Sequence, residues 1–446
     1  MSDRRVVITG VGPVAPLGVG VAEFWSALLE GRNAVRRISA FDPGRFDSHV
    51  GSQVEGVAAK DFVPKGYRKA EKIMARDIVL AVVAAHHAVS DAGLRTKCLI
   101  ERGDATGEPN LDSTRFGANI GSGLICADLA ELAEALHNSS ENGRFSIARW
   151  GTEGMNNLTP LWLLKFLPNM LACHVTIVHD CQGPSNTITC GEASSHLAIG
   201  EAFRTIARGV ADVCICGGAE SKINPMALLR QSLGRRLSRR NDDPATACRP
   251  FGLERDGTAI SEGGGLVILE DLEHARRRGA RIYAELVGFG AANDAAPPTQ
   301  PSTPPADGRG AALALRKALR DAKLDPQALD LVSAFAPGIP AHDASEAAAL
   351  KAVLGARLAE VPILAIKGGI GNNGAGSGAL DFIAMVLSLY NATLPPTVNG
   401  RFVDPSLGLR ATVGRSVDAR VETAASLAYA LGGGQNAALL IRRYRD

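Results

Sequence analysis

Short apolar runs alternate along the chain with longer amphipathic stretches. The runs are typical of buried strands, and the stretches with apolar residues three and four apart are typical of helices. Strands are expected at residues 5–9, 175–178, 210–216, 266–270, 329–335, 361–366 and 437–442. Helices are expected at residues 21–29, 70–91, 129–137, 193–208, 274–279, 311–322 and 345–354. This alternation predicts an α/β fold with parallel strands joined by right-handed crossovers.

Two stretches interrupt the alternation. Residues 138–157 are polar and contain glycine, which predicts an excursion on the surface. Residues 292–310 contain five prolines and predict a loop that divides the chain into two unequal parts. The turn Gly10-Val11-Gly12 follows a strand, but Pro13 and the missing third glycine argue against a dinucleotide site.

Composition excludes several classes of protein. The chain has 446 residues, of which 46% are hydrophobic, so a large core can form. Its 48 Lys and Arg nearly balance 46 Asp and Glu, and a net charge of +2 indicates neither nucleic-acid nor membrane binding. We expect a cytoplasmic protein, because no signal peptide or membrane-spanning segment is evident.

Cysteine usage points to a reducing environment. The eight cysteines form no CxxC pair and no zinc-type spacing, so we expect mostly buried packing residues and no metal. No motif indicates a cofactor, and we expect none.

Several motifs together resemble the β-ketoacyl synthases, in particular the 3-oxoacyl-[acyl-carrier-protein] synthase II type. They are Val6–Gly18, Gly183-Pro184-Ser185, Gly200-Glu201-Ala202, Gly217-Gly218-Ala219-Glu220, Arg249-Pro250-Phe251, Glu254-Arg255-Asp256-Gly257, Glu262-Gly263-Gly264-Gly265, Arg278-Gly279-Ala280, Ile282-Tyr283-Ala284-Glu285 and Pro395-Pro396-Thr397-Val398-Asn399. The resemblance covers essentially the whole chain.

The resemblance implies a thiolase-like fold of five αβαβα layers built from two similar halves. We place these halves at residues 1–265 and 266–446. It also implies an acyl carrier protein as partner, an acyl chain or acyl thioester as ligand, and assembly as a dimer. Either a homodimer or a heterodimer with an active ketosynthase is compatible with the sequence.

The resemblance also implies a catalytic cysteine at the start of a buried helix. Counting forward from Gly183-Pro184-Ser185 and backward from Gly200-Glu201-Ala202 reaches the same position, which is Glu192. A carboxylate cannot form the thioester intermediate, and the mixed anhydride that it would form instead is too labile to hold a growing chain. Cys190 lies two residues earlier and is an alternative nucleophile, although we expect it to pack as a small apolar side chain.

The two histidines that stabilise the oxyanion in this family are also replaced. Phe335 stands in the first histidine position and Asn372 in the second. His342 is near the first position but out of register, and we expect it in a solvated loop. The family's lysine is kept as Lys367, whereas Gly432 stands where the family has a phenylalanine gate.

Three functions therefore remain open. The first is a partner subunit without condensing activity, similar to the chain-length factors of type II polyketide systems, in which the active cysteine is also replaced. The second is a divergent condensing enzyme or acyltransferase that uses Cys190. The third is a repurposed enzyme in which Glu192 and His196, four residues apart on one helix face, form an acid–base dyad.

Overall fold

The computed structural model describes residues 4–294, 303–432 and 434–445. The main elements of the first half are β1 (Val6–Ala15), α1 (Val21–Leu29), β4 (Val50–Ser52), α2 (Arg76–Asp91), α3 (Lys97–Arg102), β5 (Phe116–Ser122), α4 (Leu129–Asn138), α5 (Ile147–Thr152), α6 (Met170–His179), β8 (Ser185–Ile188), α7 (Ser194–Ala207), β9 (Val213–Ser221), α8 (Pro225–Leu233), β10 (Ile260–Asp271) and α9 (Leu272–Arg277). Those of the second half are β11 (Ala284–Asn293), α10 (Arg309–Ala322), β12 (Leu331–Ser333), α11 (Pro340–Leu354), β13 (Pro362–Leu364), α12 (Lys367–Ile370), α13 (Ser377–Asn391), β17 (Thr423–Tyr429) and β18 (Gln435–Arg442).

The two halves repeat the same sheet topology. In the first half the strand order is β8-β5-β9-β10-β1, and in the second it is β13-β12-β17-β18-β11. In each sheet, the first three strands in this order pair in parallel, and the remaining two pairings are antiparallel. The sheets meet where β1 pairs with β11. The two similar halves expected from the resemblance are confirmed.

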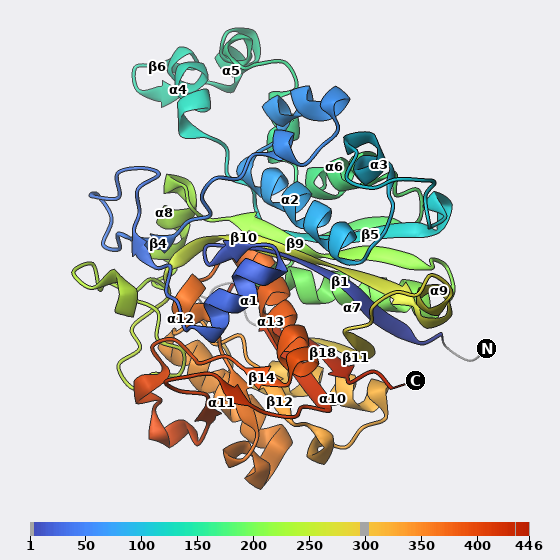
Figure 1. Ribbon diagram of the computed structural model, residues 1–446. Helices are drawn as coiled ribbons and strands as arrows, with labels where there is room; N and C mark the ends of the chain where they lie inside the picture. The colour runs from blue at the N-terminus through green and yellow to red at the C-terminus, as the bar shows by residue number, and fades with distance from the viewer. Residues whose placement is uncertain (1–3, 295–302, 433, 446) are drawn as a thin grey trace.

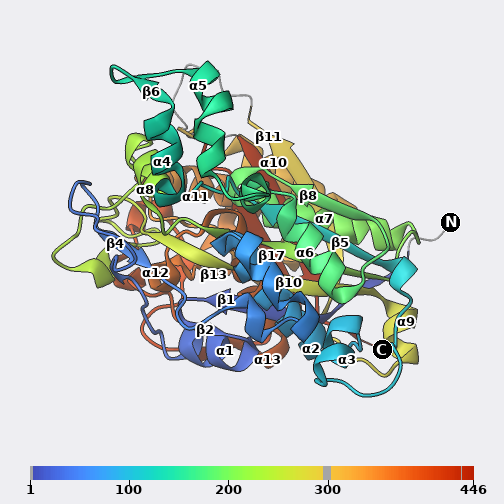
Figure 2. The same cartoon turned by 90° about the horizontal axis from the view of Figure 1, so that it is seen from above.

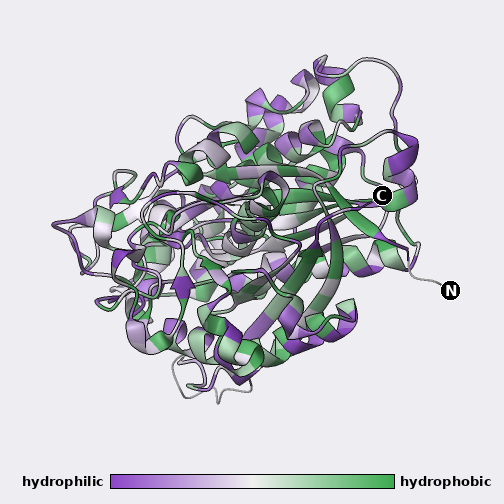
Figure 3. Ribbon diagram, turned by 60° about the horizontal axis from the view of Figure 1, so that its bottom comes forward, coloured by the Kyte–Doolittle hydropathy of each residue, from purple (hydrophilic) through white to green (hydrophobic). Residues whose placement is uncertain are grey.

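The elements stack in five layers (Figure 1). Helices α2 and α6 cover the outer face of the first sheet, α7 and α13 lie between the sheets, and α10 and α11 cover the second. Each interface buries its own apolar core, and the central one combines residues of α7, α13 and both sheets. Apolar residues accordingly concentrate inside the molecule and polar ones outside (Figure 3). The predicted α/β fold and its thiolase-like layering are confirmed.

Some predicted elements differ from the structure. Residues 175–178, expected as a strand, lie in α6, because Leu171, Val175 and Val178 recur with helical spacing and pack against the first sheet. The predicted boundary after residue 265 falls inside β10. Of the proline-rich stretch, residues 295–302 lie outside the described part of the chain.

The surface excursion predicted at residues 138–157 forms part of an arm that projects from the body (Figures 1 and 2). Helix α4 leads into the arm, followed by a two-stranded hairpin of β6 (Ser140–Glu141) and β7 (Arg144–Phe145) and then by α5. Several apolar side chains of the arm are exposed, among them Phe145 and Ile147. An arm of this kind leaves apolar surface for another chain to cover.

Helices α2 and α6 carry one partly buried histidine, His86, and two buried ones, His174 and His179. Burial lowers the pKa of His86 and of His174 to about 4. Burial, with a smaller effect of the nearby His86, lowers the pKa of His179 to about 3. A nitrogen of His179 shares a hydrogen bond of 2.9 Å with the Thr96 hydroxyl. These imidazoles stay neutral in the folded protein. They therefore do not oppose folding at a pH where the imidazoles of the unfolded chain are also neutral, but they reduce stability at lower pH, where the unfolded chain takes up protons.

We predict that His179→Gln changes the pH dependence of stability. The folded pKa lies below the unfolded value, so His179 costs stability as pH falls below about 6.5. Urea unfolding measures the difference in free energy of unfolding between wild type and the variant. The amount by which the variant is less stable than wild type should be about 1.4 kcal/mol smaller at pH 5.5 than at pH 7.5. The exposed His137→Gln variant is the control, and an equal deficit of His179→Gln at both pH values would contradict the prediction.

Candidate functional site

The site lies at the start of α7, in the middle layer between the two sheets. Strand β8 ends at Ile188, and Gly191 then turns the chain with a φ of +56°. A Cβ at Gly191 would approach the Cβ of Ala430 to 3.3 Å, so glycine suits both the conformation and the space. The Ser194 hydroxyl accepts a hydrogen bond from the Cys190 N–H and donates one to the Gly191 carbonyl. This turn delivers Glu192 into the interior.

Glu192 is held by groups from both halves. Its Oε1 accepts a hydrogen bond of 2.8 Å from Lys222 Nζ and one of 3.4 Å from Asn372 Nδ2, and its Oε2 accepts one of 2.9 Å from the Leu431 N–H. Glu192 and Lys222 are each only 5% exposed. Burial by itself raises the pKa of Glu192, but Lys222, Leu431 and Arg236 outweigh it and lower the pKa to about 2. Glu192 is therefore an ionised, fully paired carboxylate.

Phe335, which the motif register assigns to the first histidine position, and Lys367 belong to a packed core. Phe335 is fully buried and packs on Tyr429 with ring centroids 4.9 Å apart. Lys367 Nζ lies 3.9 Å from the centroid of the Phe335 ring and forms an ion pair with Asp381. Burial raises the pKa of Asp381 to about 6, although Lys367 opposes the shift. Lys367 is thus satisfied by structural neighbours and does not reach Glu192 among the described hydrogen bonds.

Asn372, which the motif register assigns to the second histidine position, connects the two halves through Glu192. It donates to Glu192, and its own Oδ1 accepts hydrogen bonds from the Gly374 N–H and the Ser377 hydroxyl. Its side chain is 1% exposed. An amide held in this way positions a carboxylate, but it does not titrate near neutral pH and so cannot act as an acid or base there.

Two histidines lie elsewhere than expected. His196 shares a hydrogen bond of 2.8 Å with the Ser426 hydroxyl, whereas Glu192 bonds Lys222, Asn372 and Leu431, so the proposed Glu192–His196 dyad is not formed. Burial and the Lys367 charge lower the pKa of His196 to about 3. His342, expected in a solvated loop, is 5% exposed on α11 and stacks on Tyr429, because the first turn of that helix faces the second-half core.

A cavity of about 560 Å³ opens onto Glu192. Cys190 lines it and is partly exposed, so this thiol is not the packing residue that the sequence suggested. Burial raises the pKa of Cys190. Gly432 also lines the cavity, and a Cβ there would lie 2.9 Å from Arg236 Nη2. The Arg236 guanidinium therefore takes up space beside the gate position.

The cavity contains charged residues that sequence reasoning missed. Lys222 and Glu220 come from the end of β9, and Arg230 and Arg236 from α8 and the loop after it. The only sequence signal was the position of Lys222, two residues after the motif that ends at Glu220. Its pairing with Glu192 depends on the meeting of β9 with the start of α7 in the fold, which sequence spacing does not disclose.

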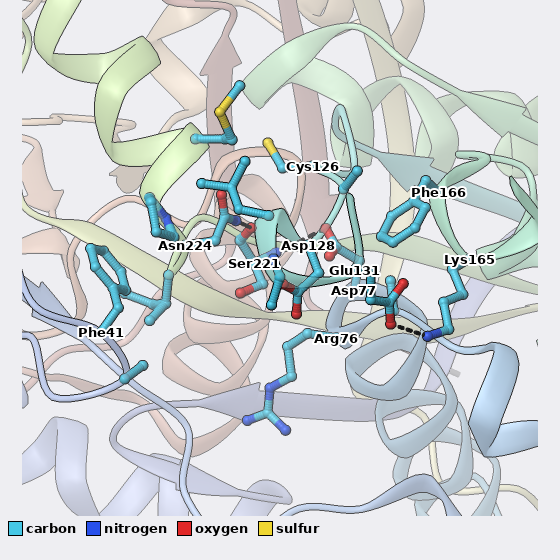
Figure 4. Close-up of a pocket in the computed structure, with 18 of the residues that line it drawn as sticks. Phe41, Arg76, Asp77, Cys126, Asp128, Glu131, Lys165, Phe166, Ser221 and Asn224 are labelled. Carbon is cyan, nitrogen blue, oxygen red and sulfur yellow. Dashed lines mark hydrogen bonds and ion pairs between the residues drawn. The ribbon is translucent and has the colours of Figure 1, made fainter. Parts of the chain in front are cut away.

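A second cavity, of about 550 Å³, lies under α4 (Figure 4). It is lined by Phe41, Asp77, Cys126, Phe166 and Asn224, among others. Lys165 pairs with Glu131 at its rim, and Arg76 bonds Glu262 beside it. The segment from Gly123 to Cys126 borders both cavities.

The part of the chain that the structure describes contains no group of three or more His, Cys, Asp or Glu side chains suited to a metal ion. Within the same residues, no helix has the length and apolar character needed to cross a membrane.

Two stacked halves with a helix start buried between them define the class of thiolase-like condensing enzymes. The N-terminal β-ketoacyl synthase domain matches residues 3–275, and the C-terminal domain of the same family matches residues 283–401. The chain therefore belongs to the β-ketoacyl synthase family.

Relatives from primary and secondary metabolism match over the whole length. A 3-oxoacyl-[acyl-carrier-protein] synthase 2 of Synechocystis sp. is 33% identical over 100% of this chain and 99% of its own. A putative polyketide β-ketoacyl synthase 1 of Streptomyces halstedii is 35% identical over 98% of each chain. The solved structure of the ishigamide ketosynthase/chain length factor matches with a TM-score of 0.82 and 29% identity, over 99% of this chain and 100% of that one.

A type II polyketide ketosynthase has also been solved in complex with its acyl-carrier protein and bound to the hexaketide. It matches with a TM-score of 0.83 and 30% identity, again over 99% of this chain and 100% of that one. The chain is thus similar to ketosynthases of both fatty-acid and polyketide synthesis.

We predict that Glu192→Gln destabilises the fold strongly. The substitution leaves Lys222 as a buried cation without its carboxylate, which costs about 3–5 kcal/mol in comparable buried pairs. Urea unfolding at pH 7.5 measures the change. Glu192→Gln combined with Lys222→Met should recover most of the loss, and a Glu192→Gln variant as stable as wild type would contradict the pairing.

Proposed function

We propose that the protein is a partner subunit without condensing activity, similar to a chain-length factor, that binds an acyl chain beside an active ketosynthase. The observation that carries the proposal is the Glu192 carboxylate at the nucleophile position, held by Lys222, Asn372 and the Leu431 N–H. Every acceptor and charge there is already satisfied within the chain, which suits a structural role.

The chemistry of condensation supports the same conclusion. A ketosynthase needs a thiolate to carry the acyl chain and two imidazoles to stabilise the oxyanion. In this chain we assign these positions to the Glu192 carboxylate, the Phe335 ring beneath Lys367, and the Asn372 amide, which already donates a hydrogen bond to Glu192. The loss of a single oxyanion donor typically slows acyl transfer by about 10²–10³-fold.

Exposed apolar surface supports a partner chain. Strand β8 is the edge of the first sheet, and α6 and the 3₁₀ segment Trp162–Phe166 lie nearby. Ile177 on α6 is 57% exposed, and Leu161 and Leu163 are 64% and 59% exposed. An edge strand flanked by exposed leucine and isoleucine is typical of a surface that pairs with another subunit.

A basic surface supports docking of an acyl carrier protein. Lys65, Arg68, Lys69 and Lys72 are exposed on the 3₁₀ segment Lys65–Ile73, and none of the four forms an ion pair within the described residues. Arg239 and Arg278, by contrast, are paired with Asp47 and Glu270. Unpaired exposed cations attract an acidic partner over a longer range.

A cytoplasmic location stays a prediction.

One observation favours the alternative enzyme. The Cys190 thiol is partly exposed in the same cavity as Glu192, where an acyl thioester would reach it. However, burial raises its pKa, which lowers the fraction of reactive thiolate at neutral pH. We therefore rank this alternative second.

We predict that acyl thioesters leave no covalent adduct on the protein. Intact-mass spectrometry after incubation with acyl-carrier-protein and acyl-CoA thioesters should return the unmodified mass, because a mixed anhydride on Glu192 would be too labile to persist. Cys190→Ala is the control. An adduct that maps to Cys190 and disappears in Cys190→Ala would reject the partner-subunit proposal in favour of the divergent synthase.

We also predict a complex with a cysteine-bearing ketosynthase from the same source. Co-expression followed by native mass spectrometry should give a heterodimer, and Ile177→Asp should weaken it at least about tenfold, because it places a charge in an apolar interface. Leu313→Asp, on the exposed face of α10, is the matched control. Recovery of only monomer or homodimer would contradict the proposal.

A further inference from the structure

Glu220 is a second buried carboxylate in the cavity at Glu192, and the structural role of that site does not use it. It lies near the end of β9, is 5% exposed and lines the cavity. Its Oε2 accepts a hydrogen bond of 2.7 Å from the Ala375 N–H. Among the described residues, its Oε1 accepts no hydrogen bond and Glu220 forms no ion pair. One oxygen of this carboxylate is therefore left for a ligand or a water molecule in the cavity.

Two glycines leave the space that the Glu220 carboxylate occupies. A Cβ on Gly123 would overlap the carboxylate, and a Cβ on Gly374 would overlap both Glu220 Oε2 and the Lys222 side chain. Gly374 also has a φ of +72°, a conformation that favours glycine. A larger residue at either position would displace the carboxylate. The fold thus keeps Glu220 and Lys222 next to each other in the wall of the cavity.

The Lys222 ammonium has hydrogen-bonding capacity left. It carries three N–H donors, and its only hydrogen bond among the described residues is the one to Glu192. Because Glu192 is ionised and lies 2.8 Å away, it holds the ammonium in place. A carbonyl oxygen that enters the cavity can accept a hydrogen bond from one of the remaining N–H groups. An oxyanion formed from that carbonyl would be stabilised more strongly than the carbonyl itself.

The two carboxylates of the cavity have opposite electrostatic environments. Burial raises the pKa of Glu220, although Lys222, the Ala375 N–H and Arg230 oppose this shift, and the Glu192 charge adds to it. Glu192 has a pKa of about 2 in spite of its burial, because of its pairing with Lys222. A carboxylate with a raised pKa is the stronger base, so Glu220 suits proton transfer better than Glu192 does. Neighbouring carboxylates whose pKa values are pushed apart are typical of acid–base catalysis.

We propose that this cavity hydrolyses acyl thioesters, with Glu220 as general base and Lys222 as the donor that stabilises the oxyanion. The inference rests on the proposed function for one point, namely that an acyl thioester enters the cavity. Glu192 is a positioning residue in this reaction, because it holds the Lys222 ammonium. The activity goes beyond acyl binding, since the subunit would release acyl groups from their thioesters without condensing them.

The reaction needs no covalent intermediate on the protein. Glu220 takes a proton from a water molecule whose oxygen attacks the thioester carbonyl carbon, and the oxyanion forms beside the Lys222 ammonium. Collapse of this intermediate breaks the carbon–sulfur bond, and the proton held by Glu220 passes to the departing thiolate. One thioester and one water therefore give one carboxylic acid and one thiol, and Glu220 returns to its ionised form.

Release of hexanoate from its N-acetylcysteamine thioester tests the proposal on the full chain. Liquid chromatography with mass spectrometry measures the hexanoate formed at pH 7.5, with buffer alone as the reference. The wild type should release hexanoate faster than buffer does. Glu220→Gln should lower the catalysed rate about 100-fold or more, because a general base typically contributes about 10²–10⁴-fold. The glutamine keeps an oxygen that can accept the Ala375 N–H, so the local structure should persist.

Two further variants complete the test. Glu192→Gln combined with Lys222→Met removes the ammonium together with its counter-charge, and it should lower the catalysed rate about 100-fold or more. Glu273→Gln, whose side chain is 66% exposed and pairs with Arg276 on α9, is the matched control and should react like wild type. Thermal unfolding verifies that each variant is folded, and the double variant keeps the test valid if Glu220→Gln fails to fold.

Three results would overturn the hydrolysis. They are release no faster than in buffer, release undiminished by Glu220→Gln, or release abolished by Cys190→Ala, which would assign the reaction to the thiol. The probe needs neither a carrier protein nor a partner subunit, so these results do not bear on the partner-subunit proposal. The ketosynthase complex is measured separately by native mass spectrometry, and its absence would reject that proposal while a measured hydrolysis would stand.

Discussion

The start of α7 is buried between two sheets, and any charge placed there must be satisfied by the protein itself. A lone carboxylate in such a place would take up a proton or unfold the local structure. Glu192 avoids both outcomes because β9 supplies Lys222, the segment before α13 supplies Asn372, and the loop after β17 supplies the Leu431 N–H. The two halves of the molecule therefore meet at this one side chain.

The same constraint shapes the surrounding side chains. Lys222 becomes a structural cation, and Lys367 on the opposite side is committed to Asp381 and the Phe335 ring. The charged groups around the start of α7 thus form a set of closed pairs. Arg230 and Arg236 line the open cavity together with the Glu192–Lys222 pair.

The surfaces that we propose for dimer formation and carrier docking lie away from the Glu192 pair. The β8 edge, the exposed residues of α6 and the projecting arm lie outside the core. The basic 3₁₀ segment Lys65–Ile73 lies on the outer layer. A protein of this fold can therefore lose its nucleophile and still keep the surfaces through which its relatives work.

The sequence by itself determined the family and the layered α/β fold, because motif spacing sets register along the chain. It misassigned residues 175–178 and His342, since short apolar runs and a single histidine carry no information on which core will cover them. The Glu192–Lys222 pair, the separation of His196 from Glu192 and the charged cavity were decided only by tertiary structure. Each depends on distances between segments 30 or more residues apart, which packing sets and local sequence does not.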